Sequence, residues 1–413
     1  MSSILVIDHN RASLAVARAL SGMGHRIVAG VSGYCDYANL SRFVAETLPV
    51  ADTADHPDRA MSDIASLCAR RTDIRGIFAV DETGTRLLAQ RRKELPRQLC
   101  IYAARPENVL QTVHKDAMSG IAEMAGLPVA PRITAGNFTE LKAAVREIGF
   151  PLVVRAVESN HDLYGRKALV CHDQQAFAAI ATDWPREDHQ QLMVQRYNAG
   201  YRHNVCWVAA EGKLHSAIEM KVLKTTTGGR DGYGTLVETA EPHPKLRYWS
   251  HRLAEALSYH GMGSPQFLVD PVTGDITFLE FNPRLDANIR LAESVMPYIE
   301  TAARLAEGGT LDFSSDPWTY QRGKRLFWAK GENQTLKTLN AEARYRELLA
   351  RAAMMPVHSL TSVHALFSWD DPMPALASHL NPLISRSPGL VREHFIPAVP
   401  EEAASPRGQD LLI

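Results

Sequence analysis

The sequence has almost no net charge, no closely spaced cysteine pairs and no long apolar runs, and each of these absences excludes some classes of protein. Its 45 basic and 46 acidic residues leave no excess of positive charge for nucleic acid or an anionic membrane. The five cysteines never form a C-x-x-C pair, which argues against a zinc site or a disulfide framework. No apolar run reaches the roughly eighteen residues of a membrane span, and no basic segment precedes an apolar one at the N-terminus. We therefore expect a cytoplasmic protein with small-molecule partners, no nucleic acid and no membrane.

The first part of the chain alternates apolar strands with helical patterns. Ser3 to Asp8 predicts a buried strand, and Ala12 to Met23 predicts the helix that follows. Further strands are predicted at 25–31, 76–80 and 100–103, with helices near 58–70 and 82–92. This alternation indicates a parallel α/β domain. The first strand–helix turn reads DHNRAS, without G-x-G-x-x-G, so a dinucleotide-binding oxidoreductase is disfavoured.

Two strand ends in this domain are polar, and two roles for them stay open. The residues are Asp8, His9 and Asn10, then Asp81, Glu82 and Thr83. They could cap the helices that follow. They could also line a ligand pocket, because open α/β sheets bind ligands beyond the carboxyl ends of their strands.

A later stretch, Ser264 to Arg290, predicts an antiparallel hairpin around the loop DPVTGD. A loop centred near Thr273 places Gln266 opposite Glu280. Strand alternation then puts four residues on one face: Ile276, Phe278, Glu280 and Asn282.

Gln266, Glu280 and Asn282 would thus converge as three oxygen-bearing side chains with one charge. Such a set suits Mg²⁺, which takes one or two protein carboxylates and completes its shell with phosphate and water. Pro283 ends the strand, and Arg284 follows as a fixed fork for phosphate. An ordinary half-buried strand is the alternative, but Glu280 would be costly to bury without a partner.

This hairpin resembles the metal-binding hairpin of the ATP-grasp superfamily, in the branch related to carbamoyl-phosphate synthetase and biotin carboxylase. In that branch the first strand supplies Glu or Gln and the second ends in E-x-N-x-R. Here these positions read Gln266, Glu280, Asn282 and Arg284. The resemblance implies an enzyme that uses ATP and Mg²⁺, with Mn²⁺ as the alternative ion, to phosphorylate a carboxylate.

The resemblance also implies residues that bind the nucleotide. Lys115 opens a helix where the family has a phosphate-binding lysine, and Arg155 stands where the family usually has another. The lid that follows, VESNHDLYGRK, has only Gly165 as glycine, with Arg166 and Lys167 after it.

The adenine edge of the family corresponds to the strand that ends at Tyr197. Gln195 and Arg196 replace the usual Glu-Lys pair, so recognition would rest on amide and backbone groups. His203 matches a histidine or acidic position near the ribose, although a structural role is equally open.

Substrate-binding residues are expected on two further segments. The loop Thr225 to Thr235 is dense in glycine, and Lys221, Lys224 and Arg230 could meet anionic oxygens there; a simple hairpin loop is the alternative. After the metal hairpin, Asp286, Asn288 and Arg290 are predicted to alternate on one extended face. Arg284, Lys224 and Arg290 are therefore the candidate catalytic residues.

The implied architecture is α/β, with α+β character in the ATP-grasp part. It comprises a parallel pre-ATP-grasp domain (1–112), two ATP-grasp lobes (113–190 and 191–310), a C-terminal extension (311–396) and an unfolded tail (397–413). The implied activity is that of a carboxylate–amine ligase, which forms an amide or peptide bond through an acyl phosphate and releases ADP and phosphate. Its substrates would be a small carboxylate and an amine, with amino acids among the candidates, and a homodimer is common in this fold. An inert nucleotide-binding module and another carboxylate-activating reaction, such as carboxylation, remain as alternatives.

Overall fold

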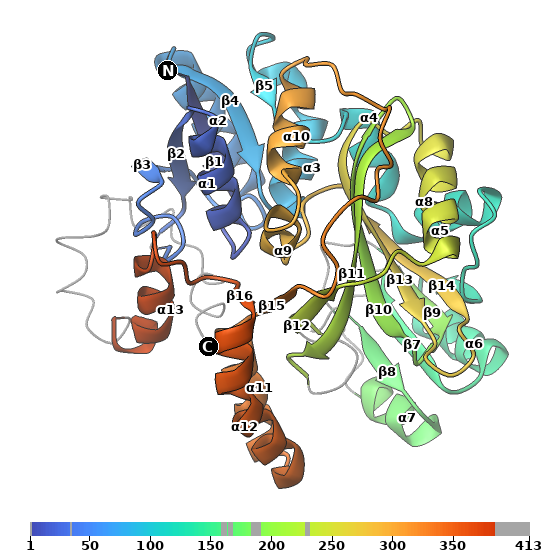
Figure 1. Ribbon diagram of the computed structural model, residues 1–413. Helices are drawn as coiled ribbons and strands as arrows, with labels where there is room; N and C mark the ends of the chain where they lie inside the picture. The colour runs from blue at the N-terminus through green and yellow to red at the C-terminus, as the bar shows by residue number, and fades with distance from the viewer. Residues whose placement is uncertain are drawn as a thin grey trace.

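A parallel sheet of five strands forms the N-terminal part of the protein (Figure 1). The computed structural model describes residues 2–33, 35–157, 163, 168–182, 191–227 and 232–384. The strands lie in the order β3-β2-β1-β4-β5 and all pair in parallel. They are β1 (Ser3–Ile7), β2 (Arg26–Val31), β3 (Val44–Pro49), β4 (Ile74–Ala79) and β5 (Cys100–Ile101). The predicted parallel α/β sheet is thus confirmed.

Helices that follow the strands cover this sheet. They are α1 (Ser13–Gly22), α2 (Pro57–Arg70) and α3 (Glu82–Gln90), with a 3₁₀ turn at Arg92–Glu94, whereas α4 (Pro106–Thr112) packs through Val109 into a different apolar core. In this sheet β3 is the one strand outside the predicted set. It is an edge strand whose residues are half-buried or exposed, so it lacks the apolar run that indicates a buried strand.

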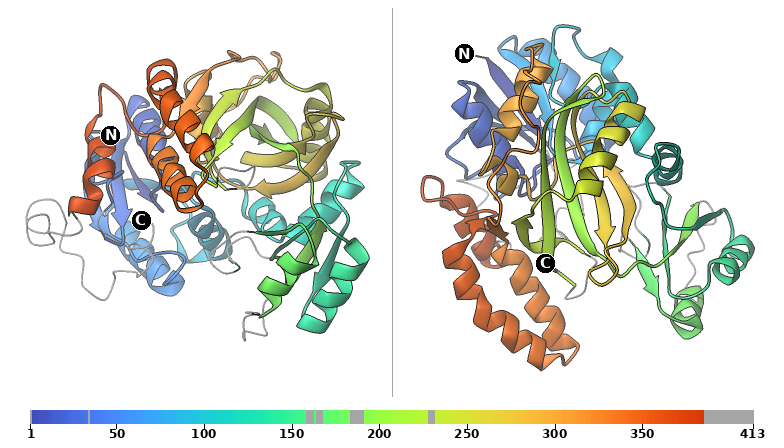
Figure 2. Two further views of the ribbon diagram at one scale, coloured as in Figure 1. Left: turned by 90° about the horizontal axis from the view of Figure 1, so that it is seen from below. Right: turned by 45° about the vertical axis from the view of Figure 1, so that its right-hand side comes forward.

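A smaller lobe has a four-stranded antiparallel sheet with its own apolar core. The strand order is β6-β9-β7-β8. These elements are β6 (Arg132–Ala135), β7 (Leu152–Ala156), β8 (Leu169–Cys171) and β9 (Leu192–Arg196), with α6 (Phe138–Ile148) and α7 (Gln174–Thr182). Leu141, Val145, Leu152 and Val194 pack together inside it. Figure 2 shows this lobe standing apart from the rest of the molecule.

The central sheet has seven strands in the order β14-β13-β10-β11-β12-β15-β16. Its bounds are β10 (Tyr201–Ala210), β11 (Lys213–Thr225), β12 (Gly234–Thr239), β13 (Gly261–Val269), β14 (Ile276–Asn282), β15 (Arg325–Phe327) and β16 (Val363–His364). The strands pair antiparallel, except that β16 joins β15 in parallel.

Alternating residues of β10 enter two different cores, one on each face of the central sheet. Cys206 and Val208 join the core shared with the N-terminal sheet, and Val205 and Trp207 join the core on the opposite face. We call these the inner and the outer face. Helices α9 (Ile289–Glu293) and α10 (Tyr298–Ala306) contribute to the inner core, and α5 (Lys115–Met124) and α8 (Pro244–Ala256) to the outer core.

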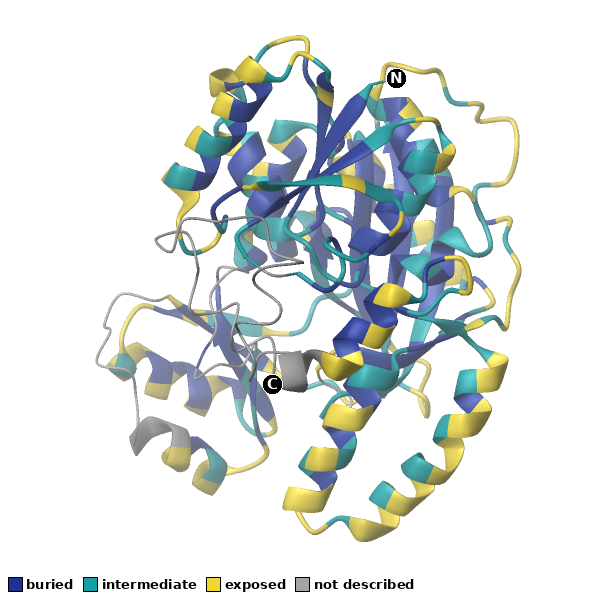
Figure 3. Cartoon of the chain, turned by 90° about the vertical axis from the view of Figure 1, so that its left-hand side faces the viewer, coloured by how far each residue is buried: buried dark blue, intermediate teal, exposed yellow. Residues whose placement is uncertain are grey.

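The C-terminal extension returns to the N-terminal sheet. Helices α11 (Ala329–Ala341) and α12 (Tyr345–Thr361) form a hairpin that projects from the body, and α13 (Met373–Ile384) follows β16. Much of the projecting hairpin is exposed (Figure 3). The predicted tail 397–413 lies outside the described residues.

Within the described ranges, no helix has both the length and the apolar character to span a bilayer.

Replacing Asp371 by Ala should destabilise the protein. The buried carboxylate of Asp371 accepts hydrogen bonds from Ser41 Oγ at 2.7 Å and from the backbone N of Arg42 at 3.0 Å. Its loss should lower the free energy of unfolding, measured by urea titration, by about 1–3 kcal/mol. The neighbouring Asp370 has a side chain 51% exposed, so Asp370→Ala should change it by less than about 0.5 kcal/mol. Equal losses in both variants would contradict this role of Asp371.

Candidate functional site

The register of the β13–β14 hairpin brings the predicted metal ligands together. Gln266 pairs with Glu280, and Ser264 pairs with Asn282. The first of these pairs was predicted from the position of the hairpin loop. Gln266 also lies opposite Asn204 on β10. Because Asn204 is two residues from Cys206 of the inner core, Gln266, Glu280 and Asn282 lie on the inner face.

One part of the predicted alternation is wrong, because a β-bulge interrupts β14. Phe267 pairs with Phe278, while the adjacent Gln266 pairs with Glu280, so Leu279 is an extra residue on β14. Ile276, Phe278 and Phe281 therefore enter the outer core. Phe278 and Glu280 lie on opposite faces, rather than on one face as predicted.

Several cations surround the Glu280 carboxylate. Burial raises the pKa of Glu280, but the combined effect of four cations is larger and lowers the pKa overall. These cations are Arg155, Lys115, Arg202 and Arg284. The group is thus held in its ionised form, which is the form that a divalent cation requires.

Arg155 and Lys115 approach Glu280 from the side of the small lobe. Arg155 is 5% exposed, and its Nη2 donates to the carbonyl of Leu279 at 3.1 Å while Nη1 lies 3.7 Å from Glu280 Oε2. Lys115, the first residue of α5, donates from Nζ to the carbonyl of Ala156 at 3.2 Å. Both predicted phosphate-binding residues therefore lie next to the hairpin.

Arg284 lies between the hairpin and the N-terminal sheet. Its Nη1 donates to the carbonyl of Leu285 at 2.8 Å, and its Nε lies 3.3 Å from Asp81 Oδ1. Burial lowers the pKa of Arg284, but the carboxylates of Asp81, Glu82, Asp286 and Glu280 raise it more strongly together. Arg284 thus remains a cation at the junction of the metal ligands and the β4 strand end.

The two polar strand ends of the N-terminal sheet combine capping with contacts beyond the sheet. Asp81 accepts the N–H of Glu82 and caps α3, yet it also approaches Arg284. Asp8 accepts a hydrogen bond from Thr53 Oγ1 at 2.7 Å, and Thr53 Oγ1 lies 2.8 Å from Thr83 Oγ1. A Cβ at Gly84 would lie 1.8 Å from Asp8 Oδ2, so only glycine leaves room for this carboxylate.

The predicted adenine-binding residues lie at the end of β9. Gln195 is buried and pairs with Arg132 and Val153, and Arg196 Nη2 donates to the carbonyl of Ile148 at 2.9 Å. The backbone N–H of Tyr197 donates to the carbonyl of Pro151. These bonds hold the strand end in the small lobe, which leaves an adenine-binding role as a prediction.

His203 lies on the outer face, and its neighbour Arg202 lies on the inner face. His203 pairs with Phe267, and its Nδ1 lies 2.6 Å from Oε1 of the buried Glu219. Arg202 is two residues from Asn204 and is one of the cations that lower the pKa of Glu280. Sequence reasoning missed Arg202. Counting alternation along β10 from the apolar run Val205–Ala209 could have identified it.

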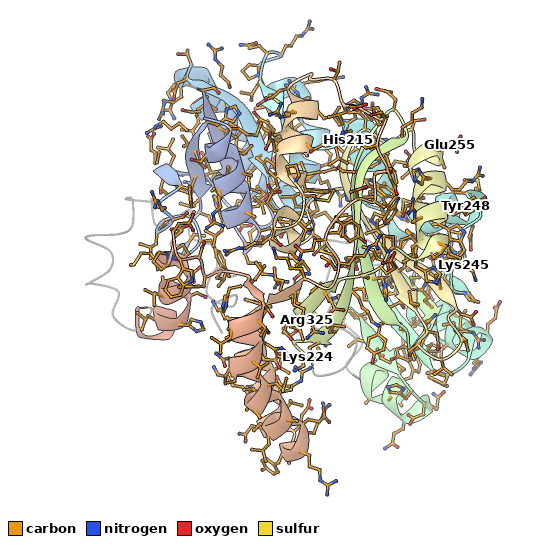
Figure 4. The ribbon with its side chains drawn as sticks, viewed as in Figure 1. His215, Lys224, Lys245, Tyr248, Glu255 and Arg325 are labelled. Atoms are coloured by element: carbon orange, nitrogen blue, oxygen red, sulfur yellow. The ribbon has the colours of Figure 1, made fainter. Side chains whose placement is uncertain are left out.

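Lys224 and Arg290 are not brought to the Glu280 carboxylate. A bulge lies between Val222 and Lys224, and Lys224 Nζ lies 3.2 Å from His358 Nε2 on α12. Figure 4 shows Lys224 near Arg325, at the end of the sheet that the α11–α12 hairpin covers. The charges that act on the Arg290 guanidinium are those of Arg18, Asp370 and Asp371, and burial lowers its pKa to about 10.

The predicted extended face of Asp286, Asn288 and Arg290 is also wrong. Asp286 Oδ1 accepts the backbone N–H of Asn288 at 2.7 Å, which turns the chain, and α9 begins at Ile289. Arg290 therefore lies in a helix. Four residues with predicted lid or substrate contacts lie outside the described residues: Gly165, Arg166, Lys167 and Arg230.

The hairpin side chains fit Mg²⁺ only if further oxygen ligands are supplied. Among the residues that the structure describes, no three acidic, histidine or cysteine side chains gather as a metal site. One ionised carboxylate and two amide side chains match the sparse protein ligation that Mg²⁺ accepts when phosphate oxygens complete the octahedron. The donor set therefore suits a metal that arrives with a nucleotide.

The arrangement of the two lobes around this hairpin is that of the ATP-grasp fold, as predicted. Residues 233–314, which include the whole hairpin, match the family model "Carbamoyl-phosphate synthase L chain, ATP binding domain". The carbamoyl phosphate synthase large chain of Pyrococcus furiosus is 24% identical over 216 residues, which is 50% of this chain and 20% of that protein. The chain thus matches about a fifth of this relative's length, and the predicted resemblance is confirmed.

Two solved structures share the fold. A biotin carboxylase from Campylobacter jejuni superposes with a TM-score of 0.62 at 18% identity, covering 78% of this chain and 74% of that chain. An L-amino acid ligase from Bacillus licheniformis gives a TM-score of 0.56 at 12% identity, covering 74% of each chain.

Replacing Asp8 by Asn should change how stability depends on pH. Burial raises the pKa of Asp8 from 3.8 to about 7; Asp81 and Asp52 act in the same direction and the Thr53 hydrogen bond opposes them. Because the carboxyl group binds its proton more tightly in the native state, it stabilises the fold. This contribution is complete below pH 3.8, the pKa in the unfolded chain, and is lost as the pH rises to about 7. Asn remains neutral and tolerates the positive φ of 59° at this position.

Relative to the unchanged protein, Asp8→Asn should therefore gain about 1–3 kcal/mol of unfolding free energy between pH 5 and pH 8. Urea titrations at both pH values measure this difference. Parallel pH profiles for the two proteins would show that Asp8 is not protonated in the native state.

Proposed function

We propose that the protein is an ATP-dependent carboxylate–amine ligase. The observation that carries the proposal is the convergence of Gln266, Glu280 and Asn282 on one face of the hairpin, with Lys115, Arg155 and Arg284 beside Glu280. One carboxylate among several cations suits a site for the phosphates of ATP and their metal ion.

In this proposal, Gln266, Glu280 and Asn282 would hold Mg²⁺ together with the ATP phosphates. The ion would neutralise phosphate charge and orient the γ-phosphoryl group. Lys115 would contact phosphate oxygens as a point charge, and Arg155 would do so with a fork fixed by its bond to Leu279. Arg284 would stabilise charge on the γ-phosphoryl group during transfer.

The proposed reaction has two steps, phosphorylation of the acid and then attack by the amine. A carboxylate oxygen of the acid attacks the γ-phosphorus, the bond to the β-phosphate oxygen breaks, and ADP leaves. The amine nitrogen then attacks the acyl carbon of the acyl phosphate, inorganic phosphate leaves, and the nitrogen loses a proton as the amide forms. Neither step requires a covalent bond to the protein.

The acidic side chains at the β4 strand end suit the amine. Asp81 lies 3.3 Å from Arg284, and Glu82 acts electrostatically on the same arginine. Carboxylates next to the phosphoryl-transfer arginine would hold an ammonium group close to the acyl phosphate. Lys224 and Arg290 receive no part in the transfer, because Lys224 contacts His358 of α12 and the charges that act on Arg290 are those of Arg18, Asp370 and Asp371.

Mg²⁺-dependent release of ADP, measured with single and paired amino acids and small carboxylates, tests the proposal. We expect release that requires one acid and one amine together, because the acyl phosphate is consumed only by the amine. ATP binding by calorimetry, without release from any pair, would favour the inert nucleotide-binding module. Release with bicarbonate alone would favour a carboxylation reaction.

Replacing Glu280 by Gln should lower Mg²⁺-dependent ADP release at least about 100-fold, because the set loses its one charged ligand. Calorimetry should also show weaker binding of Mg·ATP. Glu147 is an exposed residue of α6, and Glu147→Gln should retain full activity. Undiminished turnover in Glu280→Gln would contradict the metal assignment.

A further inference from the structure

Two arginines approach the inner face of the central sheet from different parts of the chain. Arg202 belongs to β10 and shares this face with Asn204 and Gln266. Arg11 lies just before α1 in the N-terminal sheet domain. Neither residue has a part in the phosphoryl transfer described above.

A chain of amide hydrogen bonds joins Arg11 to β10. Arg11 Nη2 donates to Asn288 Oδ1 at 3.0 Å, and Asn288 Nδ2 donates to Asp286 Oδ1 at 2.8 Å. The other oxygen of Asp286 accepts from Asn204 Nδ2 at 2.8 Å. The side chains of Asn288 and Asp286 therefore connect Arg11 to Asn204, which lies two residues after Arg202 on β10.

Arg11 is fixed in place before any ligand binds. It is 6% exposed, its Nε donates to the carbonyl of Ala287 at 3.0 Å, and its guanidinium lies 4.0 Å from the centre of the Trp328 ring. These contacts fix the plane of the fork. The Nη1 group has no partner among the described residues, so donors remain for a ligand.

Arg202 is also held by a neutral partner. Its Nη2 donates to the carbonyl of Gly232 at 2.9 Å. Its Nε is buried and has no hydrogen-bond partner in the part of the chain that the structure describes. A buried donor of a charged group without a partner is costly, and an anion would remove that cost.

Among the described residues, neither Arg11 nor Arg202 has a carboxylate in direct contact. Asp286 is the nearest acidic group of the network, but amide groups occupy both of its oxygens. No carboxylate among the described residues forms an ion pair with Arg11 or Arg202. Burial lowers the pKa of Arg11, Asp286 opposes this shift, and the charge of Arg202 adds to it. Asp286 acts on Arg11 and Arg202 acts on Glu280, but among the described residues neither guanidinium group is in direct contact with a carboxylate.

We propose that Arg11 and Arg202 bind the carboxylate group of the acid substrate, an inference that rests on the ligase activity proposed above. The planar forks match the two oxygens of a carboxylate. The nucleotide phosphates have their own cations, Lys115, Arg155 and Arg284, close to the metal ligands. Arg202 lies next to that set, so an acid held here is adjacent to the γ-phosphoryl group.

Malonate serves as the probe, because it carries carboxylates and needs no turnover. The full-length protein is first saturated with Mg²⁺ and a non-hydrolysable ATP analogue, which occupies the phosphate-binding cations. The melting temperature is then followed as malonate is added. We expect a saturable rise, and an apparent affinity at least about tenfold weaker in Arg202→Gln and in Arg11→Gln, because each loses one charged fork.

Two controls separate binding from folding. Arg202→Gln removes one hydrogen bond to Gly232 and should keep the melting temperature without malonate close to that of the unchanged protein. Arg304 has a side chain 65% exposed, so Arg304→Gln should bind malonate as the unchanged protein does.

A parallel titration omits the ATP analogue. Three results would overturn the assignment: no malonate effect on the unchanged protein up to about 100 mM in either titration, equal affinity in the arginine variants, or an effect that is seen only without the ATP analogue. The last result would identify the pair as a phosphate site. Failure of the ligase proposal would appear separately, as absent ADP release from a protein that still binds malonate through these arginines.

Discussion

The ionised carboxylate of Glu280 is the group on which the candidate site depends. Four cations from different parts of the chain act on this one group. They are Arg155 of β7, Lys115 of α5, Arg202 of β10 and Arg284 in the loop after β14. Without a negative charge at their centre, these buried and half-buried cations would repel one another. The carboxylate therefore stabilises the arrangement of cations as well as offering a metal ligand. The β14 bulge turns Glu280 into this position and leaves Phe278 and Phe281 in the outer core.

A second constraint is the polar connection between the N-terminal sheet and the central sheet. Arg11 bonds to Ala287 and Asn288, Asp286 bonds to Asn204, and Arg284 approaches Asp81. Each contact is made by a loop next to the hairpin, so the position of Glu280 is coupled to the strand ends of the N-terminal sheet. The C-terminal extension strengthens this coupling through Trp328 and Asp371.

Much of the fold follows from local patterns, whereas part of the site does not. The parallel strands β1, β2 and β4 and the pairing of Gln266 with Glu280 could be predicted, because apolar runs and a turn-rich loop determine them. The bulge at Leu279 could not, because an extra residue that changes the face of its neighbours leaves no mark in the sequence. Nor could the turn at Asp286, which depends on hydrogen bonds to Asn288 and to Asn204, 82 residues away. Placing Arg202 rather than His203 beside Glu280 required following the alternation of side chains along β10.

The separate core of the small lobe has a mechanical consequence. Its sheet β6-β9-β7-β8 packs around its own apolar residues, so the lobe can rotate as a rigid body without exposing the other cores. Arg155 is carried on β7 of this lobe, and its Nη2 reaches across to Leu279 on the hairpin. Any hinge rotation would therefore move one positive charge toward or away from Glu280. The affinity of the hairpin for a cation would then change together with the angle between the lobes.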